Sequence, residues 1–167
     1  TVFDGGWRIL SGQIPFRDFT LSNAIIPVFL QGFFFKIFGV SWFVYCLHAA
    51  VFNGLFCVLA FFFLRLFGGS RPLSFFYALL SGVIFYTPFG IPVQDQHAYF
   101  FTFLVIFLAC LSARVSRPVI KQAMFFFIPV IAVTAFLSKQ IPTVFGVCLA
   151  LVIIFFSERR NLWAPVR

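Results

Sequence analysis

Residues 40–64 read VSWFVYCLHAAVFNGLFCVLAFFFL and carry no charged side chain before Arg65. Only Ser41, His48 and Asn53 interrupt this apolar stretch. A hydrocarbon layer about 30 Å thick is crossed by about 20 apolar residues in a helix, so the stretch is long enough to span a bilayer. It predicts a transmembrane helix and therefore an integral membrane protein.

The composition of the whole chain favours the same class of protein. Of its 167 residues, 62% are hydrophobic and 10% are charged, whereas a soluble domain carries about 25% charged residues. The chain also contains 30 phenylalanines, too many for a soluble core of this size. Disordered and collagen-like chains are excluded, because the first are poor in apolar residues and the second have a glycine repeat.

Four more apolar stretches follow the first, each bounded by polar or charged residues. They cover residues 73–93, 98–113, 123–137 and 141–157. The fourth of the five stretches, 123–137, would be about 22 Å long as a helix, less than the bilayer core. Either the bilayer thins there, or Lys139 extends outward from a shallow hairpin. The sequence thus predicts an all-α, polytopic bundle of about five spans over residues 40–167.

Residues 1–39 differ from this bundle, because they contain charged residues and glycine-rich turns. The apolar segment 24–38 is too short to span comfortably. Pro27 near its start and Lys36 near its end favour a helix that lies at the membrane interface; a re-entrant segment is the alternative. We therefore expect an exoplasmic loop with an interfacial helix over residues 1–39.

The basic residues predict the orientation of the bundle. Eight of the twelve would lie on one side of the membrane: Arg65, Arg71, Arg114, Arg117, Lys121, Arg159, Arg160 and Arg167. The other four would lie on the opposite side: Arg8, Arg17, Lys36 and Lys139. The positive-inside rule places the first set in the cytoplasm and residues 1–39 outside. Basic residues that fall in short clusters between apolar runs argue against a nucleic-acid partner, despite a net charge of +8.

All three aspartates, Asp4, Asp18 and Asp95, fall on the predicted outer side. A carboxylate partly shielded from water is able to act as a general base toward a hydroxyl or amine. The alternative is that these residues cap helices in solvated loops. The fourth acid, Glu158, is expected to neutralise Arg159 or Arg160 in a cytoplasmic loop.

Arg8, Arg17 and Lys139 are the outer cations that a bound phosphate would best explain. Contact with anionic lipid headgroups is the alternative. His97, in the polar stretch 94–97, is a secondary candidate beside Asp18. His48 lies inside the first span, where an ionisable group suggests function, but we expect it to hydrogen-bond across helices.

Residues 4–19 read DGGWRILSGQIPFRDF, and residues 36–42 read KIFGVSW. These two stretches resemble the first exoplasmic loop of the polytopic GT-C glycosyltransferases. A third, LSKQIP at residues 137–142, is similar to a lysine-containing hairpin of that family. The family includes protein O-mannosyltransferase-like and aminoarabinose-transferase-like enzymes, which use polyprenyl-phosphate sugars. The resemblance implies that the chain is a piece of a longer protein and corresponds to helices two to six.

By this resemblance, Asp4 matches the loop carboxylate that activates the acceptor. Many members have two consecutive acids there, whereas this chain has Asp4-Gly5, and Phe16 replaces the usual tyrosine. Asp95 falls in the second outer loop, where the family often places another acid; it would assist Asp4 or hold a divalent cation.

The activity implied is transfer of a sugar, with inversion, from a polyprenyl-phosphate donor to a lipid, glycan or protein acceptor. Arg8, Arg17 and Lys139 would bind the donor phosphate, and the enzyme would lie in a bacterial or archaeal plasma membrane with its active side outside. The alternative from another class is a non-enzymatic membrane protein, either a transporter or a scaffold subunit.

Overall fold

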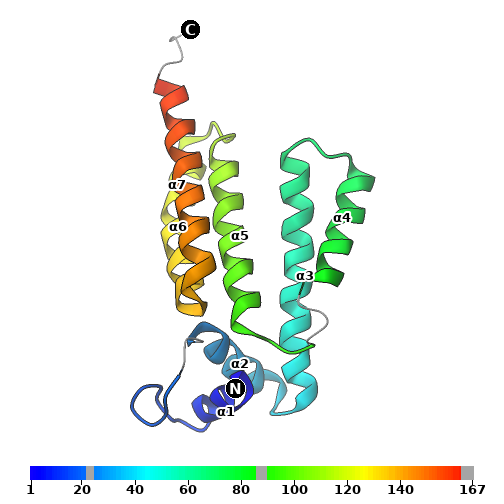
Figure 1. Ribbon diagram of the computed structural model, residues 1–167, viewed down its shortest axis with the longest axis vertical. Coiled ribbons are helices and arrows are strands. Elements are labelled where there is room, and N and C mark those ends of the chain that lie inside the picture. The colour runs from blue at the N-terminus through cyan, green and yellow to red at the C-terminus, as the bar shows by residue number, and fades with distance from the viewer. Residues whose placement is uncertain (22–24, 86–89, 163–167) are drawn as a thin grey trace.

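The computed structural model describes residues 1–21, 25–85 and 90–162, the last three as backbone only, and its regular elements there are all helices (Figure 1). The helices are α1 (Val2–Leu10), α2 (Ile25–Phe38), α3 (Trp42–Leu66), α4 (Arg71–Ile84), α5 (Gln94–Ser112), α6 (Pro118–Ser138) and α7 (Gln140–Leu162). The predicted all-α class is confirmed.

Four of these helices, α3, α5, α6 and α7, are long and apolar enough to cross a membrane. In Figure 1 the helices α5, α6 and α7 stand side by side, and the hairpin of α3 and α4 stands next to them. The two short N-terminal helices lie across one end of this bundle, which we call the α1–α2 end. The turns α3–α4 and α5–α6 lie at the opposite end.

The predicted span 73–93 is wrong as a single helix. Helix α4 has 14 residues and ends at Ile84, and Phe85 is extended. Its length of about 21 Å is less than a bilayer core. Residues 86–89 lie outside the described residues, but the sequence from 88 to 92 contains two prolines and a glycine, which end helices.

Two other helices are longer than the sequence suggested. Helix α6 has 21 residues, about 31 Å, so the predicted short span at 123–137 is wrong. It starts at Pro118, a favoured position for proline because the first turn needs no N–H donor, and it continues through Pro129. Helix α5 begins at Gln94, so residues 94–97 form its first turn and not a connection.

Helix α1 packs on α2 through two glycines. A Cβ added at Gly5 would lie 2.8 Å from Val28 Cγ1, and one at Gly6 would lie 2.7 Å from Gln31 Cγ. The absence of side chains at these positions therefore lets the two helices approach closely. As a result, α1 covers Val28 and Gln31, which are among the buried residues of α2.

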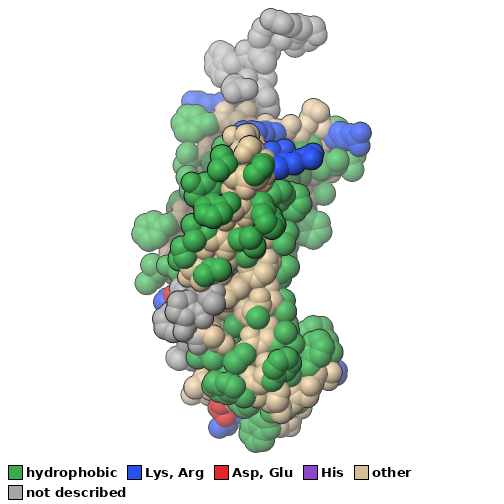
Figure 2. Space-filling model, turned by 90° about the vertical axis from the view of Figure 1, so that its right-hand side faces the viewer, with side chains coloured by type: hydrophobic (Ala, Val, Ile, Leu, Met, Phe, Trp, Pro, Cys, Tyr) green, Lys and Arg blue, Asp and Glu red, His purple; other side chains and the backbone are tan. Residues whose placement is uncertain are grey.

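The core is small and the apolar exterior is large. Phe52, Leu59 and Phe100 form one cluster between α3 and α5, and Val105, Ala109 and Ala150 form a second between α5 and α7. Large apolar side chains cover the flank of the bundle, and basic side chains gather at the end opposite α1 and α2 (Figure 2). Such a surface is suited to lipid along the flank and to water at the ends.

Candidate functional site

The charged side chains are divided between the two ends of the bundle. At the α1–α2 end lie Asp4, Arg8, Arg17, Asp18, Lys36, Asp95 and Lys139. At the opposite end lie Arg65, Arg71, Arg114, Arg117, Lys121, Glu158 and Arg159. Arg160 and Arg167, which belong to the second set by sequence, lie outside the side chains that the structure describes. The fold thus gathers the candidate site residues at one end, where they form three separate ion pairs.

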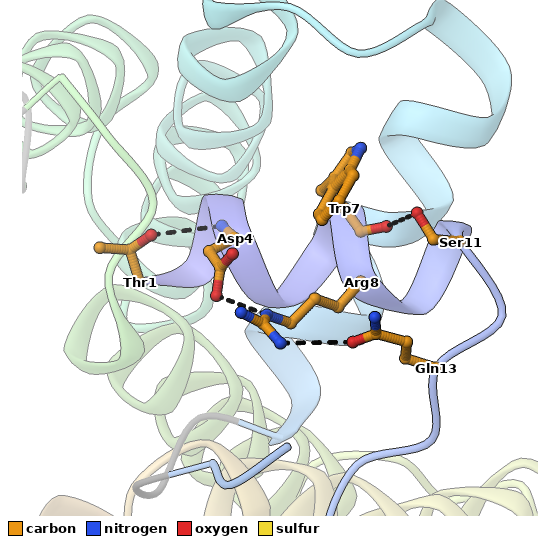
Figure 3. A network of polar contacts seen from close by, with 6 residues as sticks. All are labelled: Thr1, Asp4, Trp7, Arg8, Ser11 and Gln13. Carbon is orange, nitrogen blue, oxygen red and sulfur yellow. Dashed lines mark hydrogen bonds and ion pairs between the residues drawn. The ribbon is translucent and has the colours of Figure 1, made fainter. Parts of the chain in front are cut away.

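Asp4 and Arg8 form the first pair on one face of α1 (Figure 3). Thr1 caps the helix by accepting the N–H of Asp4 at 3.2 Å. Arg8 Nε donates to Asp4 Oδ2 at 2.9 Å and Arg8 Nη1 donates to Gln13 Oε1 at 3.3 Å. About half of the Asp4 side chain is exposed, so the pair is a local surface contact that contributes little to stability.

Arg17 and Asp18 form the second pair in the α1–α2 connection. Two guanidinium nitrogens of Arg17 donate to the Asp18 carboxylate at 3.0 and 2.9 Å, and the Ile14 N–H donates to it at 2.7 Å. The Arg17 contact first, and the Ile14 N–H second, hold the pKa of Asp18 below its usual value. Phe16, which lies between Ile14 and Arg17 in the sequence, has a φ of +66°, a left-handed conformation that L residues rarely adopt. Asp18 thus fixes a tight turn.

Asp95 and Lys139 form the third pair, and only this one joins distant parts of the sequence. Lys139 lies between α6 and α7 in extended backbone, and its Nζ donates to Asp95 Oδ1 in the first turn of α5 at 2.5 Å. The Lys139 side chain is 31% exposed, and the Asp95 side chain is 28% exposed. This pair is therefore more shielded from water than the other two.

The Asp95–Lys139 pair lies where two cavities meet. One cavity, of about 420 Å³, extends from Asp95 toward Thr1, Thr20 and Tyr45. The other, of about 520 Å³, is lined by both Asp95 and Lys139. It continues as a largely apolar groove between α5 and α7 past Ile106, Phe145 and Leu149. An ion pair at the mouth of an apolar groove suits a ligand with a charged head and a hydrocarbon chain.

The sequence suggested that His97 lies in an outer connection between spans, but the structure places it elsewhere. It is fully buried in α5, and its Nε2 lies 2.9 Å from Nε2 of His48 in α3. His48 Nδ1 lies 2.8 Å from Gln31 Oε1 in α2. The expectation that His48 hydrogen-bonds across helices is confirmed.

Two buried amide side chains beside the site were not predicted from the sequence. Gln31 and Gln96 have no exposed surface, and Gln96 Nε2 donates to Ala49 O at 3.0 Å and to Asn53 Oδ1 at 2.6 Å. For Gln31 the available signal was a lone amide in an otherwise apolar segment, which in a membrane protein is expected to find a partner on another helix. Gln96 gave no such signal, because it lies in the polar stretch 94–97.

The site does not suit a divalent cation. Within the described ranges 1–21, 25–85 and 90–159, no three His, Cys, Asp or Glu side chains lie together in a way that could hold a metal. Asp4 and Asp95 each already have a cation as partner. Glu158 is also paired, but with Lys121 of α6 and not with Arg159, which lies over the ring of Phe155.

The chain matches no known protein family, no curated protein and no solved structure. The site must therefore be interpreted from its own geometry.

Proposed function

We propose that this chain forms part of a GT-C-type membrane glycosyltransferase that takes a sugar from a polyprenyl-phosphate donor at the α1–α2 end of the bundle. The observation that carries the proposal is the Asp95–Lys139 pair, which lies between an apolar groove and a more polar cavity. The resemblance of residues 4–19, 36–42 and 137–142 to the first outer loop and hairpin of that family supports it.

Each part of the site has a role in this chemistry. The groove past Ile106 and Phe145 takes the isoprenoid chain, and Lys139 takes the phosphate as a point charge. Binding of the phosphate draws Lys139 away from Asp95, so the carboxylate is free to accept a proton. The acceptor enters from the cavity beside Thr1 and Tyr45.

The proposed transfer is a single displacement. The acceptor oxygen or nitrogen attacks C1 of the sugar while the bond from C1 to the phosphate oxygen breaks. The bond electrons leave with the polyprenyl phosphate, whose charge Lys139 stabilises, and Asp95 takes the proton of the acceptor. Asp4, which the resemblance implies as the base, becomes the second candidate because it is half exposed and pairs with Arg8. Arg8 and Arg17 are additional phosphate ligands that must first leave their own carboxylates.

The alternative, a transporter or scaffold subunit, has less support. A transporter is expected to place ionisable groups or broken helices near the middle of the bilayer. In the described parts of α3, α5, α6 and α7, the Asp, Glu, His, Lys and Arg side chains lie within about two turns of a helix end. Helix α6 continues through Pro129 without a break. Helix α4 does end early, at Ile84, but it carries none of these side chains after Arg71.

The first test is sugar transfer by the full-length protein in proteoliposomes that contain a radiolabelled polyprenyl-phosphate sugar. Asp95→Asn should lower the transfer rate by about 100-fold or more, as expected for loss of a general base. Lys139→Met should raise the donor concentration needed for half-maximal rate, and Asp4→Asn tests the second carboxylate in the same way.

The matched control is the lysine–carboxylate pair at the opposite end of the bundle. Lys121→Met and Glu158→Gln break an equivalent contact between α6 and α7, and transfer should continue at the normal rate. Full activity of both the Asp95→Asn and Asp4→Asn proteins, with normal membrane insertion, would reject the proposed function.

A further inference from the structure

A buried polar chain joins helices α2, α3 and α5 beside the candidate site. It runs from Gln31 Oε1 to His48 Nδ1 (2.8 Å), from His48 Nε2 to His97 Nε2 (2.9 Å) and from His97 Nδ1 to the carbonyl oxygen of Val93 (2.8 Å). Gln31, His48 and His97 are all fully buried. Aromatic rings also contact the two histidines: Phe34 stacks on His48, and Phe52 contacts both.

The three contacts of this chain require more protons than two neutral rings carry. An amide oxygen and a backbone carbonyl only accept hydrogen bonds, so each must face an N–H of a ring. The contact between the two Nε2 atoms requires a third proton, because two lone pairs would otherwise face each other. With the Gln31 oxygen toward His48, one histidine must therefore be a cation.

A cation is unfavourable at this position. Burial among phenylalanine rings disfavours the charged form of histidine. In the part of the chain that the structure describes, the hydrogen bonds and ring contacts of the two histidines include no carboxylate that could compensate the charge.

The Gln31 amide offers a neutral solution. Its nitrogen, Nε2, is buried and has no hydrogen-bond partner, and a buried N–H group without a partner is rare in proteins. A half turn of the amide exchanges nitrogen and oxygen. The nitrogen then donates to His48 Nδ1, His48 Nε2–H donates to His97 Nε2, and His97 Nδ1–H donates to Val93. Every contact is then satisfied by two neutral rings.

We infer that His48 and His97 are neutral and of opposite tautomer, with His48 protonated on Nε2 and His97 protonated on Nδ1. The hydrogen bonds then all run in one direction from Gln31, and this chain positions the first turn of α5 and its Asp95. Val93 is the N-cap residue of α5 and has no side-chain cap of its own. Its carbonyl oxygen accepts the first hydrogen bond of the helix. Because His97 also bonds His48 of α3, which in turn contacts Gln31 of α2, the bond from His97 to Val93 holds the start of α5 to these two helices. Asp95 lies in that first turn. The three side chains are thus positioning residues for the Asp95–Lys139 pair, whatever reaction the pair serves.

The first test measures the tautomers directly. In the full-length protein with ¹⁵N-labelled histidine, in lipid nanodiscs, the ring signals of His48 and His97 are assigned by their loss in His48→Gln and His97→Gln. At neutral pH we expect one ring protonated on Nε2, the other on Nδ1, and no imidazolium. Two rings of the same tautomer, or a cationic ring, would overturn the inference.

Replacing Gln31 tests the direction of the chain. Gln31→Glu keeps the shape of the side chain and, as a carboxylate, offers only acceptor atoms to His48, so one ring should become an imidazolium. Ser112→Ala, which removes a buried hydroxyl at the far end of α5, is the control and should leave both signals unchanged. Neutral, unchanged rings in Gln31→Glu, together with a ¹³C signal showing that the introduced carboxyl group is ionised, would contradict the assigned direction.

The second test measures positioning by the rate at which a membrane-impermeant acylating reagent modifies Lys139, followed by mass spectrometry. Gln31→Met removes the first link of the chain, so Asp95 should hold Lys139 less well and the modification should be severalfold faster. Ser112→Ala again serves as the control. An unchanged rate in Gln31→Met would overturn the positioning role, and it would do so independently of any measurement of sugar transfer.

Discussion

Ion pairs at the α1–α2 end differ in how far apart their members lie in the sequence. Asp4 pairs with Arg8 one helical turn away, and Arg17 pairs with its neighbour Asp18. Such pairs form without any tertiary structure. Asp95 and Lys139 lie 44 residues apart, so only the packing of α5 against α6 and α7 brings them together. The sequence identified both members of this pair as site candidates, but nothing in it indicated that they are partners.

At Asp18 we predict a loss of local order in acid. Because the pKa of Asp18 is below its usual value of 3.8 in the folded chain, the carboxylate stabilises the turn above about pH 3.8. This contribution is lost as the pH falls through the lowered pKa. Hydrogen exchange at the Ile14 amide, which donates to Asp18 at 2.7 Å, should be protected at pH 5 and lose protection below about pH 3.8.

The control for this experiment is Asp18→Ala, which lacks the acceptor. Its Ile14 amide should exchange at the unprotected rate at every pH. Equal protection of Ile14 in the two proteins at pH 5 would show that the carboxylate does not hold the turn.

Among the elements, close approach of helices depends on single glycines. A Cβ added at Gly146 of α7 would overlap Thr102 Cγ2 of α5, whereas one added at Gly54 of α3 would meet nothing within 4 Å. Gly146→Ala should therefore destabilise the protein by about 1–3 kcal/mol, the usual cost of overpacking. Gly54→Ala should instead stabilise it by about 0.5–1 kcal/mol, since alanine is the better helix former.

Thermal unfolding of the two alanine variants in the same detergent tests this contrast. The unfolding midpoint should fall for Gly146→Ala and rise or stay unchanged for Gly54→Ala. A stability of Gly146→Ala equal to that of the unchanged protein would mean that α5 and α7 do not pack as closely as described.

The sequence predicted the type of the long helices better than their number or their ends, since it predicted about five spans and four helices are long and apolar enough to cross a membrane. The predicted span 40–64 corresponds closely to α3, because the stretch is apolar nearly throughout. Its ends are marked by Ser41, whose hydroxyl caps the helix, and by Arg65. For α5 and α6, the errors arose where a polar residue was taken as the end of a helix. Lys121 lies inside α6 and pairs with Glu158, and Gln96 and His97 lie inside α5 with partners on α3. Polar residues end a span only if they find no partner within the bundle, and partners are a property of the fold.

For the whole molecule, the arrangement of charge predicts how it lies in a membrane. The α1–α2 end carries aspartates balanced by cations, whereas the opposite end carries basic residues with Glu158 as the one acid among the described side chains. By the positive-inside rule, we expect the opposite end to face the cytoplasm. The Asp95–Lys139 pair and both cavities beside it would then open toward the outer face.

Single cysteines test this orientation in intact cells. The background has Cys46, Cys57, Cys110 and Cys148 replaced by alanine, because all four are free thiols. Ser11 and Ser116 are exposed positions at opposite ends of the bundle, which makes Ser11→Cys and Ser116→Cys a matched pair. A membrane-impermeant maleimide should modify the cysteine at position 11 in intact cells and the cysteine at position 116 only after lysis. The reverse pattern would place Asp95 and Lys139 in the cytoplasm, where a donor presented at the outer face could not reach them, and the proposed transfer at that face would be excluded.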